Sequence, residues 1–322
     1  MPTLIFIAIA GFAAQLVDGG IGMGFGVTST TLLLFLAGLG PAQASAVVHA
    51  AELGTTLVSG FSHWRFGNVD WKIVFSLAIP GAIAAFIGAT LLSNLSLDAA
   101  EPITSTILFI IALNLMWRFS RGKIKRTVSN KPHSAPFLIG LGSVGGMVDA
   151  TGGGGWGPVT TSTLLAAGRE KPRRVVGTVS AAEFLVTLGA TLGFVFGLWE
   201  ELVAHLGAIV ALLIGGSIAA PIAAWLVSRL NPIVLGGLVG TAIAALNIST
   251  VYGGLGFEPS TFWAWFIHLA IIAVGIAATL RGHFRARAQR AQDAEEEAAE
   301  AAKEGDGADA KAVRAPEEAT AR

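Results

Sequence analysis

Long apolar segments alternate with short polar ones along most of the chain. A helix that crosses the roughly 30 Å hydrocarbon core of a membrane needs about 20 residues, and about seven segments reach that length. We therefore predict an all-α, polytopic membrane protein with about seven full transmembrane helices. These helices are expected at residues 42–62, 72–95, 101–118, 174–197, 204–228, 232–252 and 260–281.

Two further pairs of apolar segments are shorter. They lie at 3–17 with 26–39 and at 135–148 with 157–168. Each member has about 12 to 15 residues, or roughly 18 to 22 Å of helix, which is too short to cross comfortably. Glycine joins the two members of each pair, so we predict two short helical hairpins that are broken or re-entrant.

Lysine and arginine gather in three regions, and cytoplasmic loops of membrane proteins are enriched in these residues. The regions follow the third predicted crossing, the second short pair and the last crossing, around residues 118–131, 169–174 and 281–290. Crossings alternate correctly only if the pair at 135–168 begins and ends in the cytoplasm, while the pair at 3–39 begins and ends outside. We expect the N-terminus outside and the C-terminus in the cytoplasm.

The two halves of the chain repeat one another. Asp18 and Asp149 lie 131 positions apart, as do Glu52 and Glu183. Three full crossings separate the two hairpins, so the second half is predicted to be inverted, as in many secondary transporters. A duplication without a transport role is the alternative. The predicted organisation is a first repeat at 1–118, a basic cytoplasmic linker at 119–134, the second, inverted repeat with a final helix at 135–282, and a charged, disordered cytoplasmic tail at 283–322.

Composition narrows the class further. Hydrophobic residues make up 53% of the chain and charged residues 13%, which is far from a soluble domain. Lys plus Arg equals Asp plus Glu, 21 against 21, so net charge says nothing about a nucleic-acid or acidic partner. We expect no nucleic-acid partner. Cysteine is absent, which excludes disulfides and thiolate metal sites. We expect no cofactor, no metal and no catalytic residue, because the chain has neither a G-x-x-x-x-G-K-[ST] loop nor a G-x-S-x-G elbow.

Each short pair is interrupted by a glycine-rich break that begins at an aspartate. Non-helical backbone at membrane depth survives only where protein or a polar cavity satisfies it, and the following helix start presents free N–H groups that favour an anion. Close helix packing through small residues is the alternative. The substrate-binding candidates at the breaks are Gly22, Gly24, Phe25, Ser29, Thr30, Gly153, Gly155, Trp156, Thr160 and Thr161.

Four carboxylates lie in apolar surroundings, in two matched pairs. Intramembrane charges usually mark function. Asp18, Glu52, Asp149 and Glu183 either latch the glycine loops or relay protons, and both readings stay open. His49 shares a helix face with Glu52 and is a further binding candidate that could titrate near neutrality.

Asn114 and Asn247 are matched polar residues in otherwise apolar helices. They are secondary candidates, either for helix packing or as substrate donors. No lysine or arginine falls centrally in a predicted crossing, so an anion would be held by backbone dipoles and hydroxyl groups.

The paired motifs, Asp18 to Gly26 and Asp149 to Pro158, resemble those of the TauE/SafE family over about residues 1–282. Each motif is followed by a Ser/Thr-bearing segment and a proline-started helix with Glu52 or Glu183. The resemblance implies a bacterial inner-membrane permease that exports sulfite, sulfoacetate or a related small anion by alternating access. Its partners would be that anion, membrane lipid and, in a homo-oligomer, further copies of the chain.

Two points stay open at this stage. Ile21 and Met23 interrupt the glycine pattern of the first break, so one break or both could contact the substrate. A carrier or channel for a cation or another small anion, using the intramembrane carboxylates, is the alternative function. An intramembrane hydrolase is disfavoured, because no His/Asp/Ser set occurs at mirrored positions.

Overall fold

The computed structural model describes residues 2–21, 23–122, 132–226 and 231–314, which form helices and no strands. This confirms the predicted all-α class. The elements, with two short π-helices named η, are α1 (Pro2–Ile21), α2 (Phe25–Leu32), η1 (Leu33–Ala37), α3 (Pro41–Arg65), α4 (Trp71–Ser93), α5 (Leu97–Ser120), α6 (Ala135–Gly152), η2 (Gly157–Thr161), α7 (Ser162–Ala167), α8 (Pro172–Ala204), α9 (Leu206–Leu226), α10 (Pro232–Gly254) and α11 (Thr261–Arg314).

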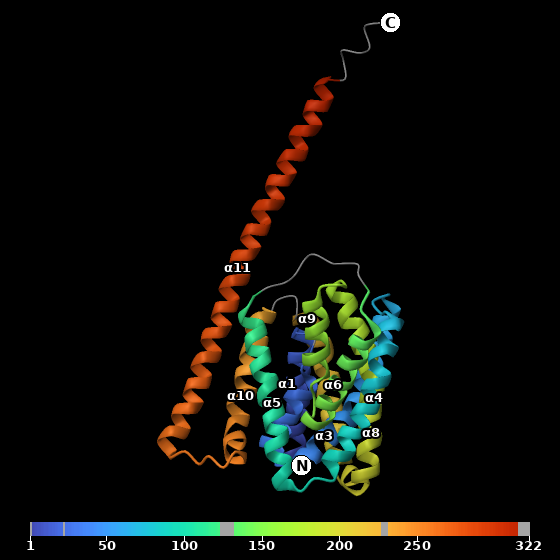
Figure 1. Ribbon diagram of the computed structural model, residues 1–322, viewed down its shortest axis with the longest axis vertical. Coiled ribbons are helices and arrows are strands. Elements are labelled where there is room, and N and C mark those ends of the chain that lie inside the picture. Colours follow the sequence, from blue (N-terminus) through green and yellow to red (C-terminus); the bar gives the residue numbers. More distant parts are fainter. Residues whose placement is uncertain (1, 22, 123–131, 227–230, 315–322) are drawn as a thin grey trace.

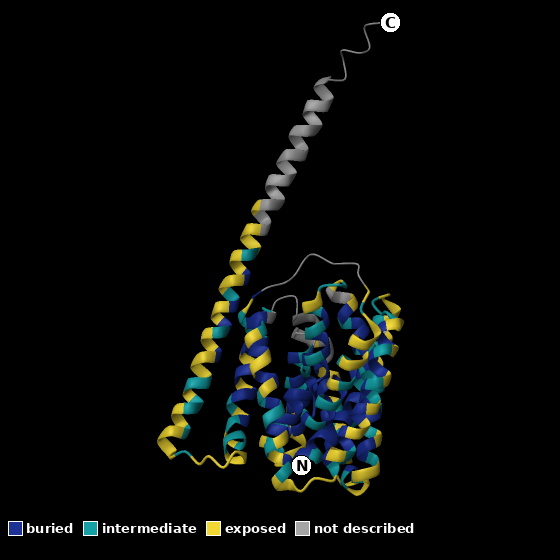
Figure 2. Cartoon of the chain, in the orientation of Figure 1, coloured by how far each residue is buried: buried dark blue, intermediate teal, exposed yellow. Residues whose placement is uncertain are grey.

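The helices form one bundle, and α11 stands at its side and extends well beyond it (Figure 1). Buried residues fill the middle of the bundle, while exposed ones cover its periphery and α11 (Figure 2). The periphery is apolar: Phe75, Ile79 and Ile83 form an exposed stripe along α4. An apolar stripe at helical spacing that faces outward is expected where a helix faces lipid.

Within the described part of the chain, five helices are long and apolar enough to cross a membrane, namely α4, α5, α8, α10 and α11. The predicted count of seven also included α3 and α9. α3 has 25 residues, but it carries His49 and Glu52, which lower its hydropathy. In α9 the apolar stretch found among the described residues is Leu206–Ala219. The count of seven therefore stays a prediction, whereas a multi-pass membrane protein is supported.

The first arm of each hairpin is longer than the sequence analysis predicted. α1 has 20 residues and α6 has 18, or about 30 and 27 Å of helix at the standard rise. The prediction ended both arms at the aspartates, but the helices continue through Asp18 and Asp149 for about one more turn. The return arms agree with the predicted segments 26–39 and 157–168. α2 continues into η1, so that the first return arm is helical over Phe25–Ala37, and η2 continues into α7 over residues 157–167 in the second.

The two hairpins enter the bundle from opposite ends (Figure 1). The first one ends at Gly40, beside Leu97 at the start of α5. The second one has both ends at the far end of α5, where the Arg169 side chain donates to the backbone oxygen of Pro132 at 2.7 Å and Arg118 contacts Ser162.

Several glycines outside the breaks serve close helix packing. α1 lies against α9, and α6 lies against α4. Gly11 of α1 faces the backbone of Leu212, and Gly146 of α6 faces the backbone of Gly81, at distances that leave no room for a Cβ atom. The packing interpretation of small residues therefore holds for these glycines.

α8 and α11 also differ in length from their predicted segments. α8 bends at Leu198, where φ is −138°, one residue after the predicted crossing 174–197 ends. α11 continues past residue 283, where the charged tail was predicted to begin, and runs as a helix to Arg314. The Ala, Glu, Lys and Arg content of that stretch favours helix.

Asp70 ties the start of α4 to α8. Its Oδ1 accepts hydrogen bonds from the backbone N–H groups of Lys72 and Ile73 at 3.0 and 3.3 Å, and Arg174 donates to its Oδ2 at 2.7 Å. Partial burial alone raises the pKa of Asp70, but the hydrogen bonds from Arg174 and from the first turn of α4 outweigh it. The pKa of Asp70 therefore lies below its usual value.

We expect Asp70→Ala to lower the free energy of unfolding by about 1 kcal/mol at neutral pH, because it removes a helix N-cap. A depressed folded pKa gives stability that is present above the unfolded pKa of about 4 and is lost as the pH falls through the folded value. Unfolding in detergent across an acidic pH series measures this stability. The difference in free energy of unfolding between the wild type and Asp70→Ala should become smaller as the pH falls. Asp70→Asn is the control that keeps the cap. A gap that stays constant with pH would contradict the interpretation.

Candidate functional site

The two glycine breaks meet in the middle of the bundle. A Cβ atom added to Gly26 would lie 2.7 Å from the Cα atom of Gly154 and 3.1 Å from Oε1 of Glu52. One added to Gly157 would lie 2.8 Å from the Cβ atom of Met23. Each break thus requires glycine where the backbone of the other break passes.

The break backbones adopt conformations that favour glycine. φ is 118° at Gly24, 65° at Gly153 and 135° at Gly154. Left-handed conformations are strained for residues with a side chain. Gly153 ends α6 in this conformation, and its N–H group donates to the backbone oxygen of Asp149.

An aspartate holds each break in place. Oδ1 of Asp149 accepts hydrogen bonds from the backbone N–H groups of Gly155 and Trp156 at 2.7 and 2.9 Å. The Asp18 carboxylate accepts one from the backbone N–H of Phe25, the residue that matches Trp156 in the repeat. These contacts are the ones expected of loop latches.

His49 reaches across to the second break. It is fully buried, its Nδ1 lies 2.8 Å from the backbone oxygen of Ser45 and its Nε2 lies 3.1 Å from Oδ2 of Asp149. A carbonyl oxygen only accepts, so Nδ1 donates to Ser45. A helix of the first half therefore contacts the aspartate that holds the second break.

Hydroxyl groups cap the buried end of α6. Ser45 donates to the backbone oxygen of Ala150 at 2.8 Å, and Thr104 donates to that of Thr151 at 3.0 Å. Thr30 donates to the backbone oxygen of Gly153. The last carbonyl groups of a helix lack partners within it and need others at membrane depth. Thr30, predicted to bind substrate, is engaged in this cap.

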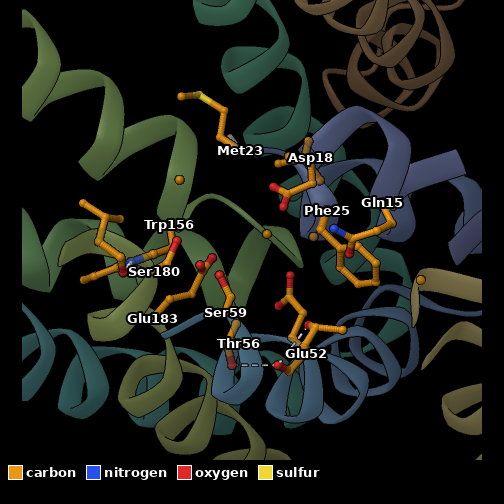
Figure 3. Close-up of a pocket in the computed structure, with 18 of the residues that line it drawn as sticks. Gln15, Asp18, Met23, Phe25, Glu52, Thr56, Ser59, Trp156, Ser180 and Glu183 are labelled. Carbon is orange, nitrogen blue, oxygen red and sulfur yellow. Dashed lines mark hydrogen bonds between the residues drawn. The ribbon is translucent and has the colours of Figure 1, made fainter. Parts of the chain in front are cut away.

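A cavity of about 880 Å³ lies between the two breaks and helices α3, α8 and α9. All four predicted carboxylates line it. Asp18, Glu52 and Glu183 point toward one another across it (Figure 3). The other predicted residues that line it are Gly24, Phe25, Gly155, Trp156 and Thr161.

The remaining predicted residues lie elsewhere. Thr160 donates to the backbone oxygen of Trp156, and Ser29 is fully buried. These two and Thr30, His49 and Gly153 are not among the residues that line the cavity. Gly22 lies outside the described residues.

The sequence analysis missed several polar residues in the cavity. Thr56, Ser59 and His63 of α3 line it, together with Glu52. Their spacing of three to four residues is that of one helix face, so this stripe was present in the sequence but was not used. Gln15, Ser180 and Ser217 add polar groups from three other helices, and Thr55 adds one more from α3.

Comparison with known proteins identifies the family. The chain matches the family described as "Sulfite exporter TauE/SafE" over residues 7–250. The chain belongs to the TauE/SafE family. This confirms the resemblance seen in the glycine motifs and supports a membrane transporter.

Two relatives of this TauE/SafE protein come from Bacillus subtilis (strain 168). The first, "Probable membrane transporter protein YtnM", is 44% identical over 286 residues, which cover 87% of this chain and 92% of the relative. The second, "Probable membrane transporter protein YdhB", is 26% identical over 197 residues, 61% of this chain and 78% of the relative. No solved structure matches the chain.

The cavity of this TauE/SafE protein is acidic. None of the described residues that line it is a lysine or an arginine. The side chains of Glu52 and Glu183 have no hydrogen bond or ion pair within the described part of the chain. Like charges in a water-poor site disfavour one another, so these carboxylates either retain protons or attract a cation. No group of three or more His, Asp and Glu side chains among the described residues is placed to hold a metal ion.

The two asparagines do not reach the cavity of the TauE/SafE protein. Asn247 is fully buried and donates to the backbone oxygen of Ile243 at 2.9 Å. Asn114 lies on the exposed side of α5. The Asn247 bond stays within α10, and its Oδ1 has no hydrogen-bond partner within the described part of the chain, so both readings stay open for the two asparagines.

Proposed function

We propose that this protein is a secondary transporter that exports a small sulfur-containing anion, such as sulfite or sulfoacetate, across the bacterial inner membrane. One observation carries the proposal: both glycine breaks line a single central cavity of about 880 Å³, in a chain of a family described as sulfite exporters. Secondary transporters bind substrate where discontinuous helices meet near the midplane.

The anion would bind to helix starts and hydroxyl groups. The first amides of each break already serve Asp18 and Asp149, but the next ones line the cavity. The N–H groups of Val27 and Gly157 have no acceptor within the described part of the chain, because the helical hydrogen bonds begin at Thr28 and Val159. Free amides at helix starts favour anions, and the hydroxyl of Thr161 lies beside them.

Protons would accompany the anion. An anion can occupy this cavity only if most of Asp18, Glu52 and Glu183 are neutral, since like charges repel strongly at short range. Binding of the anion therefore favours protonation of the carboxylates, and loss of the anion favours their ionisation. This couples anion flux to proton flux without ATP.

The geometry supports alternating access by an inverted repeat. The hairpins enter from opposite ends, and each packs its first arm against a helix of the other half, α1 on α9 and α6 on α4. Arg118, Arg169 and Arg281 lie toward the end of the bundle from which α11 emerges. Cytoplasmic loops are rich in such residues, so we assign that end to the cytoplasm and the N-terminus to the outside.

A cation carrier is the second candidate. The four carboxylates that line the cavity favour it, since none of the described lining residues is a lysine or an arginine. An intramembrane carboxylate that remained ionised would be a ligand for a cation and a barrier to an anion.

We expect the purified protein to be stabilised against heat by sulfite or a small sulfonate and to move that anion in liposomes. Ligand binding raises the unfolding temperature in a concentration-dependent way. Sodium, potassium and divalent cations as chloride salts form the comparison. Stabilisation by a cation, with no effect of any sulfur anion, would refute anion export and favour the second candidate.

A further inference from the structure

Arg118 occupies an unexpected position. Because Arg118 lies at the end of a predicted crossing, the sequence analysis assigned it to the basic cytoplasmic region around residues 118–131. The side chain instead turns into the protein and is half-buried. Its Nη1 lies 3.0 Å from Sδ of Met23 and donates a hydrogen bond to Oγ of Ser162. It thus joins the first break to the return arm of the second hairpin.

The partners of Arg118 are weak ones. No carboxylate within the described part of the chain pairs with it. A thioether sulfur is a poor acceptor, yet two donors approach the same sulfur, since Oγ of Ser162 also lies 3.8 Å from Sδ of Met23. A buried charge normally has a counter-charge. The Met23 sulfur therefore occupies a position that suits a stronger hydrogen-bond acceptor.

Met23 separates these donors from the central cavity. It lines the cavity on one side and contacts Arg118 on the other. Methionine is unbranched and adapts its shape easily. A change of side-chain rotamer at Met23 would connect the guanidinium group with the cavity.

We propose that Arg118 and Ser162 form a second anion subsite on the cytoplasmic side, with Met23 as the movable plug between this subsite and the central cavity. The inference rests on the proposed anion transport. A guanidinium group binds the oxygens of a planar or tetrahedral oxyanion with two parallel hydrogen bonds. Such a subsite supplies the positive charge that the central cavity lacks, and it lies at the side from which an exported anion arrives.

Arg121 provides the matched control. It lies one turn further on, its side chain is exposed, and its guanidinium stands 4.1 Å from the centre of the Trp117 ring. The positive charges of both arginines interact favourably with the negative, C-terminal end of the α5 helix dipole and with the cytoplasmic interface. Only Arg118 faces the two hairpins. A comparison of the two separates anion binding from a general effect of positive charge.

The test measures the saturation of sulfite flux from the cytoplasmic side in inverted vesicles. Arg118→Gln should raise the KM for sulfite about tenfold or more, because one charge-assisted interaction is lost, and should leave the maximal rate nearly unchanged. Arg118→Lys should fall between this variant and the wild type, and Arg121→Gln should match the wild type. Ser162→Ala should raise KM in the same sense by a smaller factor.

Two results would overturn the subsite. One is a wild-type KM in Arg118→Gln, and the other is an equal rise in Arg121→Gln. Unfolding temperatures without anion show whether each variant is folded; if Arg118→Gln is not, Arg118→Lys and Ser162→Ala decide, and wild-type KM values in both count against the proposal. If the wild type itself shows no saturable flux of sulfite or of a sulfonate, the proposed function fails instead.

Discussion

Gly154→Ala is expected to abolish transport and to lower the free energy of unfolding by about 3 kcal/mol or more. Gly154 has a φ of 135°, which is strained for alanine. The added Cβ atom would also overlap the backbone of Gly26 and Val27 in the other break. Neither backbone can move without opening the contact between the two hairpins. Chemical unfolding in detergent and anion flux in liposomes measure the two effects.

Gly140→Ala is the matched control for this substitution. Gly140 lies in α6, in the same hairpin, and a Cβ atom there would meet nothing within 4 Å. Alanine should be neutral at this position or stabilise the helix by up to about 1 kcal/mol. If Gly154→Ala unfolded at the same denaturant concentration as the wild type, the close contact of the two breaks would be wrong.

The sequence was sufficient for the class of fold and for the position of the breaks. Apolar segments of membrane length predict helices regardless of what they pack against, and α3 begins at the proline that was predicted to start it, Pro41. An aspartate followed by glycines has break amides within reach, so a loop latch was one of the two roles that the sequence left open for Asp18 and Asp149. These inferences depend on local chemistry alone.

The contacts between the two halves of the chain could not be predicted from the sequence. His49 and Asp149 are 100 positions apart, and the position that matches His49 in the repeat is Ser180, so the repeat gave no hint of this pair. Thr30 was predicted to face the substrate, but it caps α6 because the two hairpins cross next to it. The helical period shows which residues share one face of a helix. The neighbour that this face contacts depends on how the helices cross.

The lengths of the hairpin arms were underestimated for a related reason. Glycine weakens an isolated helix by about 1 kcal/mol, so the glycines near Asp18 and Asp149 were taken as the ends of helices. In the bundle, Gly152 at the end of α6 lies directly against Ile107 of α5, and Ser45 and Thr104 donate to the backbone oxygens of Ala150 and Thr151. Packing gained at such close contacts offsets the weak propensity.

The double variant Glu52→Gln with Glu183→Gln is expected to remove most of the pH dependence of anion flux. In the wild type the anion shares the cavity with carboxylates that must be neutral, so flux should rise as the pH falls, by up to about tenfold per pH unit for each proton bound together with the anion. Glutamine has nearly the same shape as neutral glutamic acid and cannot ionise. The variant should therefore show a much weaker dependence of rate on pH and should carry fewer protons, with Asp18 as the remaining cavity carboxylate that can titrate.

Initial rates of sulfite flux, measured with a pH-sensitive dye inside the liposomes, test both parts of this expectation. Glu258→Gln is the control, because Glu258 is an exposed residue in the segment between α10 and α11, and it should keep the wild-type pH slope. Asp18 and Asp149 remain in place in the double variant and continue to hold the breaks. A double variant that retains the wild-type slope and its proton flux would exclude Glu52 and Glu183 as the proton carriers and leave Asp18 as the remaining carboxylate without a basic partner in the cavity.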